Sequence, residues 1–472
     1  MKFLPVIGLE IHAQLNTETK LFCSCKNEFD SPPNTNVCPI CLGYPGTLPV
    51  LNKKAVEFAI KAGLALNCKI NKESYFARKN YFYPDLPKGY QITQYEVPLC
   101  ENGYLEINGK KIRIKRIHIE EDAGKSIHDK ADYTKIDFNR SGVPLIEIVT
   151  EPDIESPDEA VEFLRMLRIT LIYIGINDGN MQEGSLRCDS NISVRKEGQG
   201  LPDFRVEIKN LNSFRFLHKA LDYEIRIQSE SLNKGEKIET STKLWDTKRN
   251  QTFVMRKKEE EFDYRYFPEP DLGALVVNDE LIESIRKELP ELPVDRRKRL
   301  RREYGLNDEG ARFYTFNPDI LEIFENTAKI NKNIKKIDSW LRTEYMMYLK
   351  ENNLEVSETK LSSKNLSELI ELVDNGDITG KIAKDIFEDV INGKNPKDII
   401  KEKGLEKFDD VEKLREMLLE LIENNPKEVS KYKAGNKRMS AFFIGRIMAK
   451  TKGQANPKII NDLIREYLYE EE

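Results

Sequence analysis

The sequence predicts an α+β protein in which a largely antiparallel sheet with helices on one face is followed by an almost wholly helical part. Up to about residue 293, short strand-like runs alternate with turns, and two helix patterns interrupt them. Beyond the proline-spaced segments 267–270 and 288–293, apolar residues recur at helical spacing. At 472 residues the chain is also too long for one core, so we expect more than one domain.

Charge and hydropathy exclude several classes of protein. The formal net charge is −5, so any binding of nucleic acid has to come from local basic patches. No stretch approaches the roughly 20 apolar residues of a membrane span. Charged residues follow the first apolar segment too soon for a signal peptide. We therefore expect a soluble, cytoplasmic protein.

The first expected strand, Val6–Leu15, alternates apolar and polar residues. Its odd positions are apolar, whereas its even positions include Gly8, Glu10 and His12. Because successive side chains of a strand point to opposite faces, Glu10 and His12 lie side by side on one face. This pattern fits the solvated face of an antiparallel strand as well as it fits part of a functional site.

Four of the seven cysteines cluster as Cys23-x-Cys25 and Cys38-x-x-Cys41. In a chain without a secretion signal, such pairs favour metal binding over disulfides. Four soft thiolates suit tetrahedral Zn²⁺, and a closed set of four leaves no position for a substrate. We therefore predict a structural zinc that anchors the polar loop 26–36, with coincidental thiols in a loop as the alternative.

Segment 78–90 mixes cations, among them Lys79 and Lys88, with aromatic rings. Such a surface suits phosphate contacts and base stacking. Packing of the rings into the core explains the segment equally well.

A second expected strand covers Ile112–Ile119 and leads into Glu121. Glu121 falls in the apolar phase of Ile117 and Ile119, which predicts a carboxylate on the buried side unless a bulge or strand end intervenes.

A third expected strand, Val143–Thr150, is apolar except for Glu147 near its middle. Such a run is typical of a strand buried on both faces, where an ionised carboxylate costs several kcal/mol unless it is paired or bound to a metal. The two interpretations are an ion pair, with Arg140 as a partner, and a cation ligand. Carboxylates together with the single imidazole of His12 suit Mg²⁺ or Mn²⁺.

Two helices are expected within this first part. One opens at Ser156-Pro157-Asp158-Glu159, which combines an N-cap, a proline at the first helical position and a capping-box glutamate, and it ends near Gly175. The other covers roughly Phe214 to Leu232. We expect both to cover one face of the sheet.

Basic residues gather at two places in the helical part. Arg296 to Arg302 form a dense run, which a solvated helix face explains about as well as a binding surface. The tail surrounds a small apolar core with cations and is typical of a helical module that binds RNA; these cations are Lys431, Lys433, Lys437, Arg438, Arg446, Lys450 and Lys452.

Several long motifs resemble the family of bacterial Asp/Glu-tRNA amidotransferase B subunits (GatB), nearly from end to end of the chain. The motifs are Gly8-Leu9-Glu10-Ile11-His12, residues 78–85, His118-Ile119-Glu120-Glu121-Asp122-Ala123-Gly124-Lys125, residues 144–153, Glu183-Gly184-Ser185-Leu186-Arg187-Cys188-Asp189, residues 263–270 and residues 451–457.

The resemblance implies a domain organisation and a set of site residues. It implies a cradle-shaped kinase and transamidase domain (1–293) with a zinc-binding loop (23–41), a helical domain (294–404) and a tRNA-binding tail similar to YqeY (405–472). The residues that match the family's Mg²⁺ site are His12, Glu121 and Glu147, with Glu10 adjacent. The cysteine cluster matches a zinc site of some members. Further candidates for phosphate or acceptor-end contacts are Lys79, Lys88 and Arg187.

The implied activity is the ATP-dependent amidation of glutamate on tRNA(Gln) or aspartate on tRNA(Asn). The sequence shows no glutaminase signature, so an amidase partner, GatA, would supply ammonia through a channel, and the small protein GatC would bind as well. Two other interpretations stay open: a noncatalytic tRNA-binding scaffold of the same complex, and a metal hydrolase that uses the same acids.

Overall fold

The computed structural model describes residues 3–127, 132–257, 264–405, 410–434, 436–451 and 454–468. It divides into two compact units, Met1–Arg296 and Arg297–Glu472. Of the motifs quoted above, Asp263 and the pair Lys452-Gly453 lie outside the described residues. The finer division of the helical part at residue 405 stays a prediction.

A nine-stranded sheet forms the body of the first unit. The strand order is β14-β13-β12-β11-β1-β10-β7-β6-β2, and all neighbours are antiparallel except β12 and β13. The strands are β1 (Phe3–Gln14), β2 (Lys69–Ile70), β6 (Cys100–Ile107), β7 (Lys110–Glu121), β10 (Pro144–Thr150), β11 (Leu186–Lys196), β12 (Val206–Lys209), β13 (Ser241–Asp246) and β14 (Gln251–Lys257). The three strands expected from the sequence are confirmed as β1, β7 and β10.

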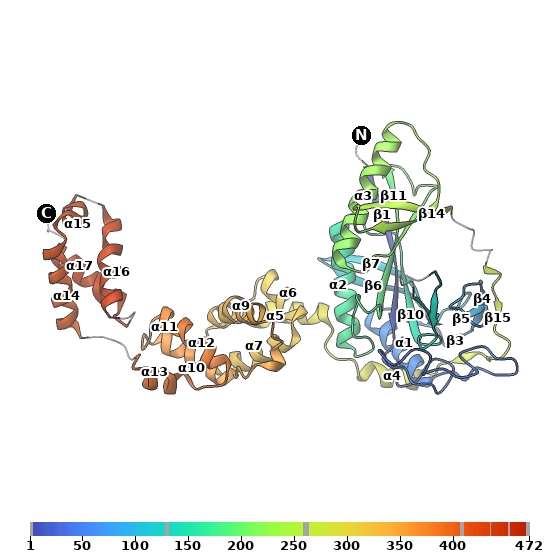
Figure 1. Cartoon of the computed structure of the whole chain (residues 1–472), viewed down its shortest axis with the longest axis horizontal. Helices are drawn as coiled ribbons and strands as arrows, with labels where there is room; N and C mark the ends of the chain where they lie inside the picture. The colour runs from blue at the N-terminus through green and yellow to red at the C-terminus, as the bar shows by residue number, and fades with distance from the viewer. Residues whose placement is uncertain are drawn as a thin grey trace. The chain divides into compact units, whose positions relative to one another are not determined.

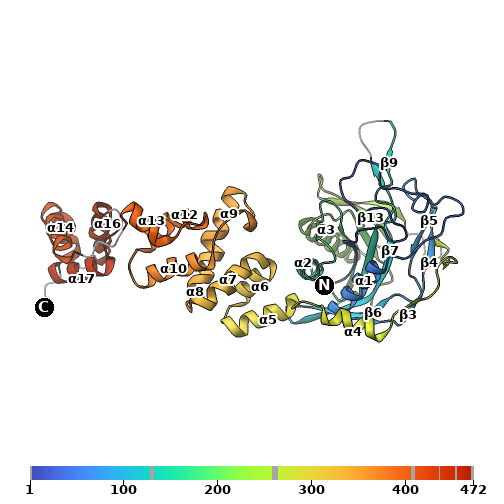
Figure 2. The same cartoon turned by 90° about the horizontal axis from the view of Figure 1, so that it is seen from below.

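Helices α1 (Lys53–Ala65), α2 (Pro157–Tyr173) and α3 (Phe214–Asn233) pack on this sheet, α1 against β6 and β7, α2 against β6 and α3 against β11. Both predicted helices are confirmed, and the side chain of Ser156 caps α2 by accepting from the N–H of Glu159. Figures 1 and 2 show α2 and α3 on one side of the long strands, with β4 and β5 on the other. The predicted α+β class is therefore confirmed.

Three small sheets complete the first unit. One has the order β15-β4-β5, from Phe267–Pro268, Ala77–Asn80 and Tyr90–Thr93, and its strand β5 packs against β7. The others pair β16 (Leu275–Val276) with β3 (Glu73–Ser74) and β8 (Lys125–Ile127) with β9 (Lys135–Asp137). Helix α4 (Asp279–Lys287) follows. The sheet with β4 and β5 brings Lys79 towards the face of the main sheet that α2 and α3 leave open.

The described elements beyond residue 290 are all helical. They are α5 (Pro293–Tyr304), α6 (Asp308–Phe316), α7 (Pro318–Ile330), α8 (Ile334–Ser339), a π-helical segment (Trp340–Tyr345), α9 (Met346–Asn352), a 3₁₀ turn (Val356–Glu358), α10 (Ser363–Asp374), α11 (Gly380–Asp385), α12 (Phe387–Ile391), α13 (Pro396–Lys403), α14 (Val411–Asn424), α15 (Pro426–Lys433), a 3₁₀ turn (Lys437–Met439), α16 (Ser440–Lys450) and α17 (Pro457–Leu468).

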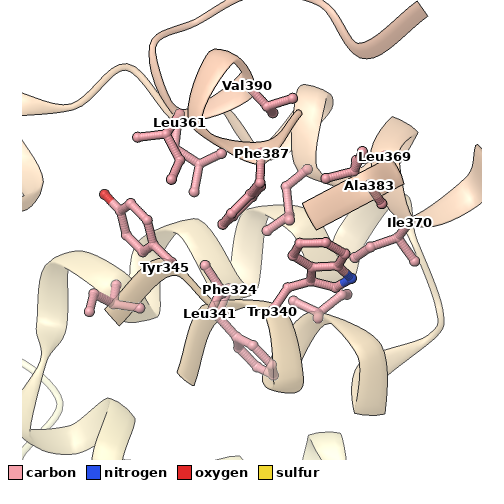
Figure 3. Packing of buried hydrophobic residues seen from close by; sticks show 14 of the residues in the cluster. Phe324, Trp340, Leu341, Tyr345, Leu361, Leu369, Ile370, Ala383, Phe387 and Val390 are labelled. Atoms are coloured by element: carbon pink, nitrogen blue, oxygen red, sulfur yellow. The ribbon is translucent and has the colours of Figure 1, made fainter. Parts of the chain in front are cut away.

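Two apolar clusters stabilise these helices. In the first, Trp340 packs against Phe387 with ring centroids 4.8 Å apart, and Phe324 and Leu341 are fully buried beside them (Figure 3). The second is built around Leu414, Phe443 and Ile464 of α14, α16 and α17. Among the described residues, no helix combines the length and the apolar character needed to cross a membrane.

Candidate active site

A row of polar side chains crosses the centre of the main sheet. His12 on β1 is paired directly with Glu147 on β10 and with Arg187 on β11, and Glu147 is paired with His118 on β7. Because directly opposite residues in antiparallel strands point to the same face, these four side chains form one row. The register of four strands therefore assembles the site.

The candidate metal site lies on the same face as this row and consists of His12, Glu120 and Glu147. One ligand atom from each lies within 4.8 Å of the others. The Nε2 of His12 is 3.3 Å from Oε2 of Glu147, and the Nε2 of His118 is 3.6 Å from the same oxygen. Among the described residues, Oε2 of Glu120 is buried without a hydrogen-bond partner. An imidazole and two carboxylates with such an unsatisfied oxygen fit a divalent cation.

The charges of this cluster are strongly coupled to their neighbours. Burial alone would raise the pKa of Glu147, but His118 and His12 outweigh it and hold that pKa well below its usual range. Burial alone would lower the pKa of His12, but its hydrogen bond to Glu147 keeps that pKa above its usual value. The pKa of Glu120 is lowered because Lys79 and His118 outweigh the effect of burial. Both carboxylates are therefore ionised at neutral pH, as metal ligands have to be.

Lys79 on β4 faces the two carboxylates. Burial would lower the pKa of Lys79, but Glu120, Tyr266 and Glu147 together raise it, so this lysine is a cation. Its Nζ also lies 5.1 Å from the ring centroid of Tyr264. A half-buried cation beside a candidate metal site suits the binding of phosphoryl oxygens.

The structure differs from the expected cluster in one residue, because Glu120 and not Glu121 lies beside His12 and Glu147. Glu121 is the last residue of β7, and its carboxylate forms an ion pair with Lys88 and accepts from the N–H of Ile92 at 2.9 Å. Adjacent side chains of a strand point to opposite faces, so only one of the two glutamates reaches His12. Lys88, expected to contact phosphate, is engaged by Glu121 and is only 8% exposed.

Two further predicted residues, Glu10 and Arg187, are engaged by neighbouring side chains. Glu10 accepts a hydrogen bond from Nδ2 of Asn191 at 2.8 Å, and Arg187 donates to Asp122 at 2.6 Å. Arg140, the alternative partner of Glu147, donates instead to the carbonyl oxygens of Ala123 and Gly124. The interpretation of Glu147 as an Arg140 ion pair is therefore wrong.

A cavity of about 250 Å³ lies over the row and opens the cluster to a substrate. Its lining includes Glu10, His12, Lys79, Glu120 and Glu147. The lining also includes Tyr95 and Tyr266, whose rings stack with centroids 4.0 Å apart. A polar cavity with two ionised carboxylates, an imidazole and the ammonium group of Lys79 can hold a divalent cation and the phosphoryl groups that this cation binds.

The four predicted cysteines also come together. Cys23, Cys25, Cys38 and Cys41 place their sulfur atoms within 4.8 Å of one another, so the cluster can hold a metal ion. Its hydrogen bonds from Cys23 and from the backbone N–H of Cys38 lower the pKa of Cys41 to about 5, against the effect of burial. Ser141 donates to the carbonyl oxygen of Cys41 at 3.1 Å, which ties the cluster to the segment before β10.

A fully buried lysine accompanies the cysteines. Lys20 is 0% exposed, and its Nζ lies 3.7 Å from Sγ of Cys41 and 3.3 Å from the carbonyl oxygen of Phe138. A buried ammonium needs a counter-charge. Four thiolates on one divalent ion carry an excess negative charge and would supply it, so the donor set and its surroundings fit zinc.

Three residues of the two clusters and their surroundings, His118, Glu120 and Lys20, were not predicted from the sequence. The alternation of β7 carried a usable signal for His118 and Glu120, because they alternate with the apolar positions Ile117 and Ile119 and so face away from the helices. Lys20 stands alone between apolar and polar neighbours, and we find no sequence signal for its burial.

Comparisons with known proteins agree with this arrangement. Residues 5–283 match a family model described as GatB/GatE catalytic domain, and residues 322–468 match one described as GatB domain. The chain is 52% identical over 475 residues to the B subunit of the aspartyl/glutamyl-tRNA(Asn/Gln) amidotransferase of Thermodesulfovibrio yellowstonii, with all of both chains covered. It is 51% identical over 474 residues to the protein of the same name in Persephonella marina, with 99% of this chain and 100% of that one covered. The chain therefore belongs to the family of aspartyl/glutamyl-tRNA(Asn/Gln) amidotransferase B subunits.

Proposed function

We propose that this chain catalyses the ATP-dependent transamidation of Glu-tRNA(Gln), Asp-tRNA(Asn) or both, in the cytoplasm where translation supplies these substrates. The observation that carries the proposal is the cluster of His12, Glu120 and Glu147 with Lys79 in a 250 Å³ cavity. The cavity lies within the residues that match the catalytic-domain model. The relatives of this chain are named as subunits of an aspartyl/glutamyl-tRNA(Asn/Gln) amidotransferase.

The chemistry requires an activated carboxylate. A side-chain carboxylate is a poor acyl donor because it is anionic and has no leaving group. Transfer of the γ-phosphoryl group of ATP to one carboxylate oxygen breaks the bond to ADP and creates an acyl phosphate. Ammonia then attacks the carbonyl carbon, inorganic phosphate leaves, and the nitrogen loses a proton to form the amide.

The residues of the cavity would divide this work. His12, Glu120 and Glu147 would hold Mg²⁺, which when bound offsets the charge of the phosphoryl oxygens. Lys79 would orient the transferred phosphoryl group through its ammonium, which lines the cavity. Glu10, at the edge of the cavity, would accept the proton that ammonia loses. The buried walls would protect the acyl phosphate from water.

We further propose a complex with an amidase, GatA, and a small third protein, GatC, since the relatives are named as B subunits. GatA would release ammonia from glutamine and deliver it through a channel, because free ammonia is protonated at neutral pH. The exposed cations of the tail, including Lys431, Arg438 and Arg446, would contact tRNA. Zinc at the four cysteines would be structural.

The test separates catalysis from scaffolding. The complex is given misacylated tRNA, ATP and ammonium chloride without glutamine, and amidated tRNA is measured. Glu147→Gln should abolish the product while tRNA binding and the melting temperature stay unchanged. Glu101→Gln, which removes a partly exposed carboxylate paired with Lys69 outside the cavity, should be active. Normal activity of Glu147→Gln would overturn the proposal in favour of a noncatalytic scaffold.

A further inference from the structure

Gln91 joins the small sheet that carries Lys79 to the carboxylates of the candidate metal site. It lies on β5 and is only 5% exposed. In the register of β4 and β5 it is paired directly with Lys79, so both side chains point to the same face of the small sheet. Because the side chain of Gln91 contacts β7, this face is turned towards the main sheet. Gln91 and Lys79 therefore reach the site side by side, from the same pair of strands.

The amide of Gln91 makes three hydrogen bonds. Its Nε2 donates to Oε1 of Glu120 and, at 2.6 Å, to the backbone carbonyl oxygen of Glu121. Its Oε1 accepts from the hydroxyl group of Tyr81 at 3.0 Å. Both partners of Nε2 are acceptors, so the NH₂ group has to face them and Tyr81 has to be the donor at the other end. The orientation of the amide is thus fixed from both sides.

The two carboxylate oxygens of Glu120 consequently have different surroundings. Oε1 accepts from Gln91, whereas Oε2 is buried and has no hydrogen-bond partner within the described part of the chain. The Nε2 of His118 lies 3.7 Å from Oε2, which is too far for a hydrogen bond. A buried carboxylate oxygen without a donor is costly unless a cation approaches it. Oε2 is therefore the oxygen left for an ion shared with His12 and Glu147.

We propose that Gln91 is a positioning residue of the metal site, which holds Glu120 by one carboxylate oxygen and so presents the other to the ion. A free glutamate side chain samples many rotamers, and ordering them costs free energy when the ion binds. Gln91 imposes this order before the ion arrives. Hydrogen bonds of this kind to metal ligands typically change the metal affinity about 10- to 100-fold. The inference rests on the proposed function, since it concerns the cation which that reaction requires.

Gln91→Met removes the amide and keeps the length of the side chain. In this variant β5 stays joined to β7, because the backbone N–H of Ile92 donates to the carboxylate of Glu121 at 2.9 Å. The chain offers a matched control on α3, where Gln228 is 1% exposed and donates to the buried carboxylate of Glu224 at 3.1 Å. Gln228→Met therefore removes the same kind of hydrogen bond outside the cavity.

The experiment measures the binding of Mn²⁺, which prefers the same kinds of ligand as Mg²⁺, to the whole complex without ATP or tRNA. Electron paramagnetic resonance quantifies the free Mn²⁺, and the site is the binding that Glu147→Gln abolishes. We expect Gln91→Met to raise the Kd for Mn²⁺ about tenfold or more. The Mg²⁺ concentration for half-maximal ammonium-driven transamidation should rise by a similar factor, with the KM for tRNA unchanged. Gln228→Met should bind Mn²⁺ as wild type does, even where its melting temperature falls.

The opposite results are equally clear. An unchanged Kd for Mn²⁺ in a folded Gln91→Met would overturn the inference, and so would an equal rise in Gln228→Met, which would mean that such bonds act only through stability. If Gln91→Met does not fold, Tyr81→Phe keeps the ring and removes only the hydroxyl group that orients the amide. It should raise the same Kd about threefold, and an unchanged Kd there would overturn the inference as well. Equal Mn²⁺ binding by wild type and Glu147→Gln would instead refute the metal site of the proposed function itself.

Discussion

The cysteine cluster and the histidine–carboxylate cluster are both sets of metal-ligating side chains, but the chain assembles them differently. All four cysteines come from residues 23–41, a segment without regular helix or strand. His12, Glu120 and Glu147 come from three strands far apart in sequence and meet only through the register of the sheet.

This difference indicates whether the metal stabilises the protein or the protein positions the metal at each site. The loop around the cysteines has little apolar core of its own, so a metal would stabilise the loop. In the sheet cluster the strands are held by their own hydrogen bonds and by buried apolar residues, so the sheet would hold the metal. Removing a ligand should therefore cost stability at the cysteines and activity at the sheet.

The largest expected effect is the loss of activity in Glu120→Gln. Because this change removes a proposed metal ligand, ammonium-driven transamidation should fall about 1,000-fold or more, with little change in melting temperature. Glu121→Gln is the matched control one residue away and should keep its activity within about tenfold of wild type. Inactive Glu121→Gln beside active Glu120→Gln would restore the cluster that the resemblance implies.

The ion pair of Lys88 and Glu121 lies next to the cysteine cluster, since both residues line a small cavity with Cys23 and Cys41. Lys88→Met leaves the carboxylate of Glu121 buried, only 3% exposed, without its cation. The free energy of unfolding should fall by about 3–5 kcal/mol, measured by urea denaturation. The exposed pair of Lys69 and Glu101 provides the control, because Lys69→Met should cost less than about 1 kcal/mol. Lost activity with unchanged stability would mean that Lys88 contacts phosphate after all.

Cys38→Ser tests the cysteine cluster itself. We expect the zinc content of the purified protein to fall and the melting temperature to drop, by roughly 2–4 °C for each kcal/mol lost. Amidation measured well below that temperature should be retained. Cys188→Ser, at a buried cysteine on β11 outside the cluster, should leave zinc content unchanged. Equal zinc in both variants would contradict a four-cysteine site.

The same contrast explains how far the sequence could predict the molecule. The cysteine spacing identified the whole cluster because its ligands are local. The strand patterns placed His12 and Glu147 correctly on their strands. Whether Glu120 or Glu121 lies on the same face of the sheet as Glu147 is set by the register between β7 and β10. Lys20 and the 250 Å³ cavity were beyond the sequence because several distant segments form their surroundings.

The smallest expected effect concerns Asp122, which connects the segment after β7 to the row of the site through Arg187. Burial would raise the pKa of Asp122, but Arg187 and Arg140 outweigh it and hold that pKa below its usual value. A carboxylate with a depressed pKa stabilises the folded state above its unfolded pKa of about 3.9, and this stability is lost as the pH falls through the folded pKa. Asp122→Asn should therefore lower the free energy of unfolding at pH 7 by about 1 kcal/mol, a modest loss because Arg187 is one-third exposed to solvent.

The two proteins should approach each other in stability below about pH 4, where wild type loses the contribution and the variant has none to lose. Urea denaturation at pH 7, 5 and 3.5 measures this convergence. Asp279→Asn, at an exposed carboxylate paired with Lys72, is the control and should follow the wild-type curve. A constant difference between Asp122→Asn and wild type across this range would mean that Asp122 acts through its hydrogen bond from Gln14 and not through its charge. In that case the row of the site would depend on strand pairing alone, which would make its contrast with the cysteine cluster sharper.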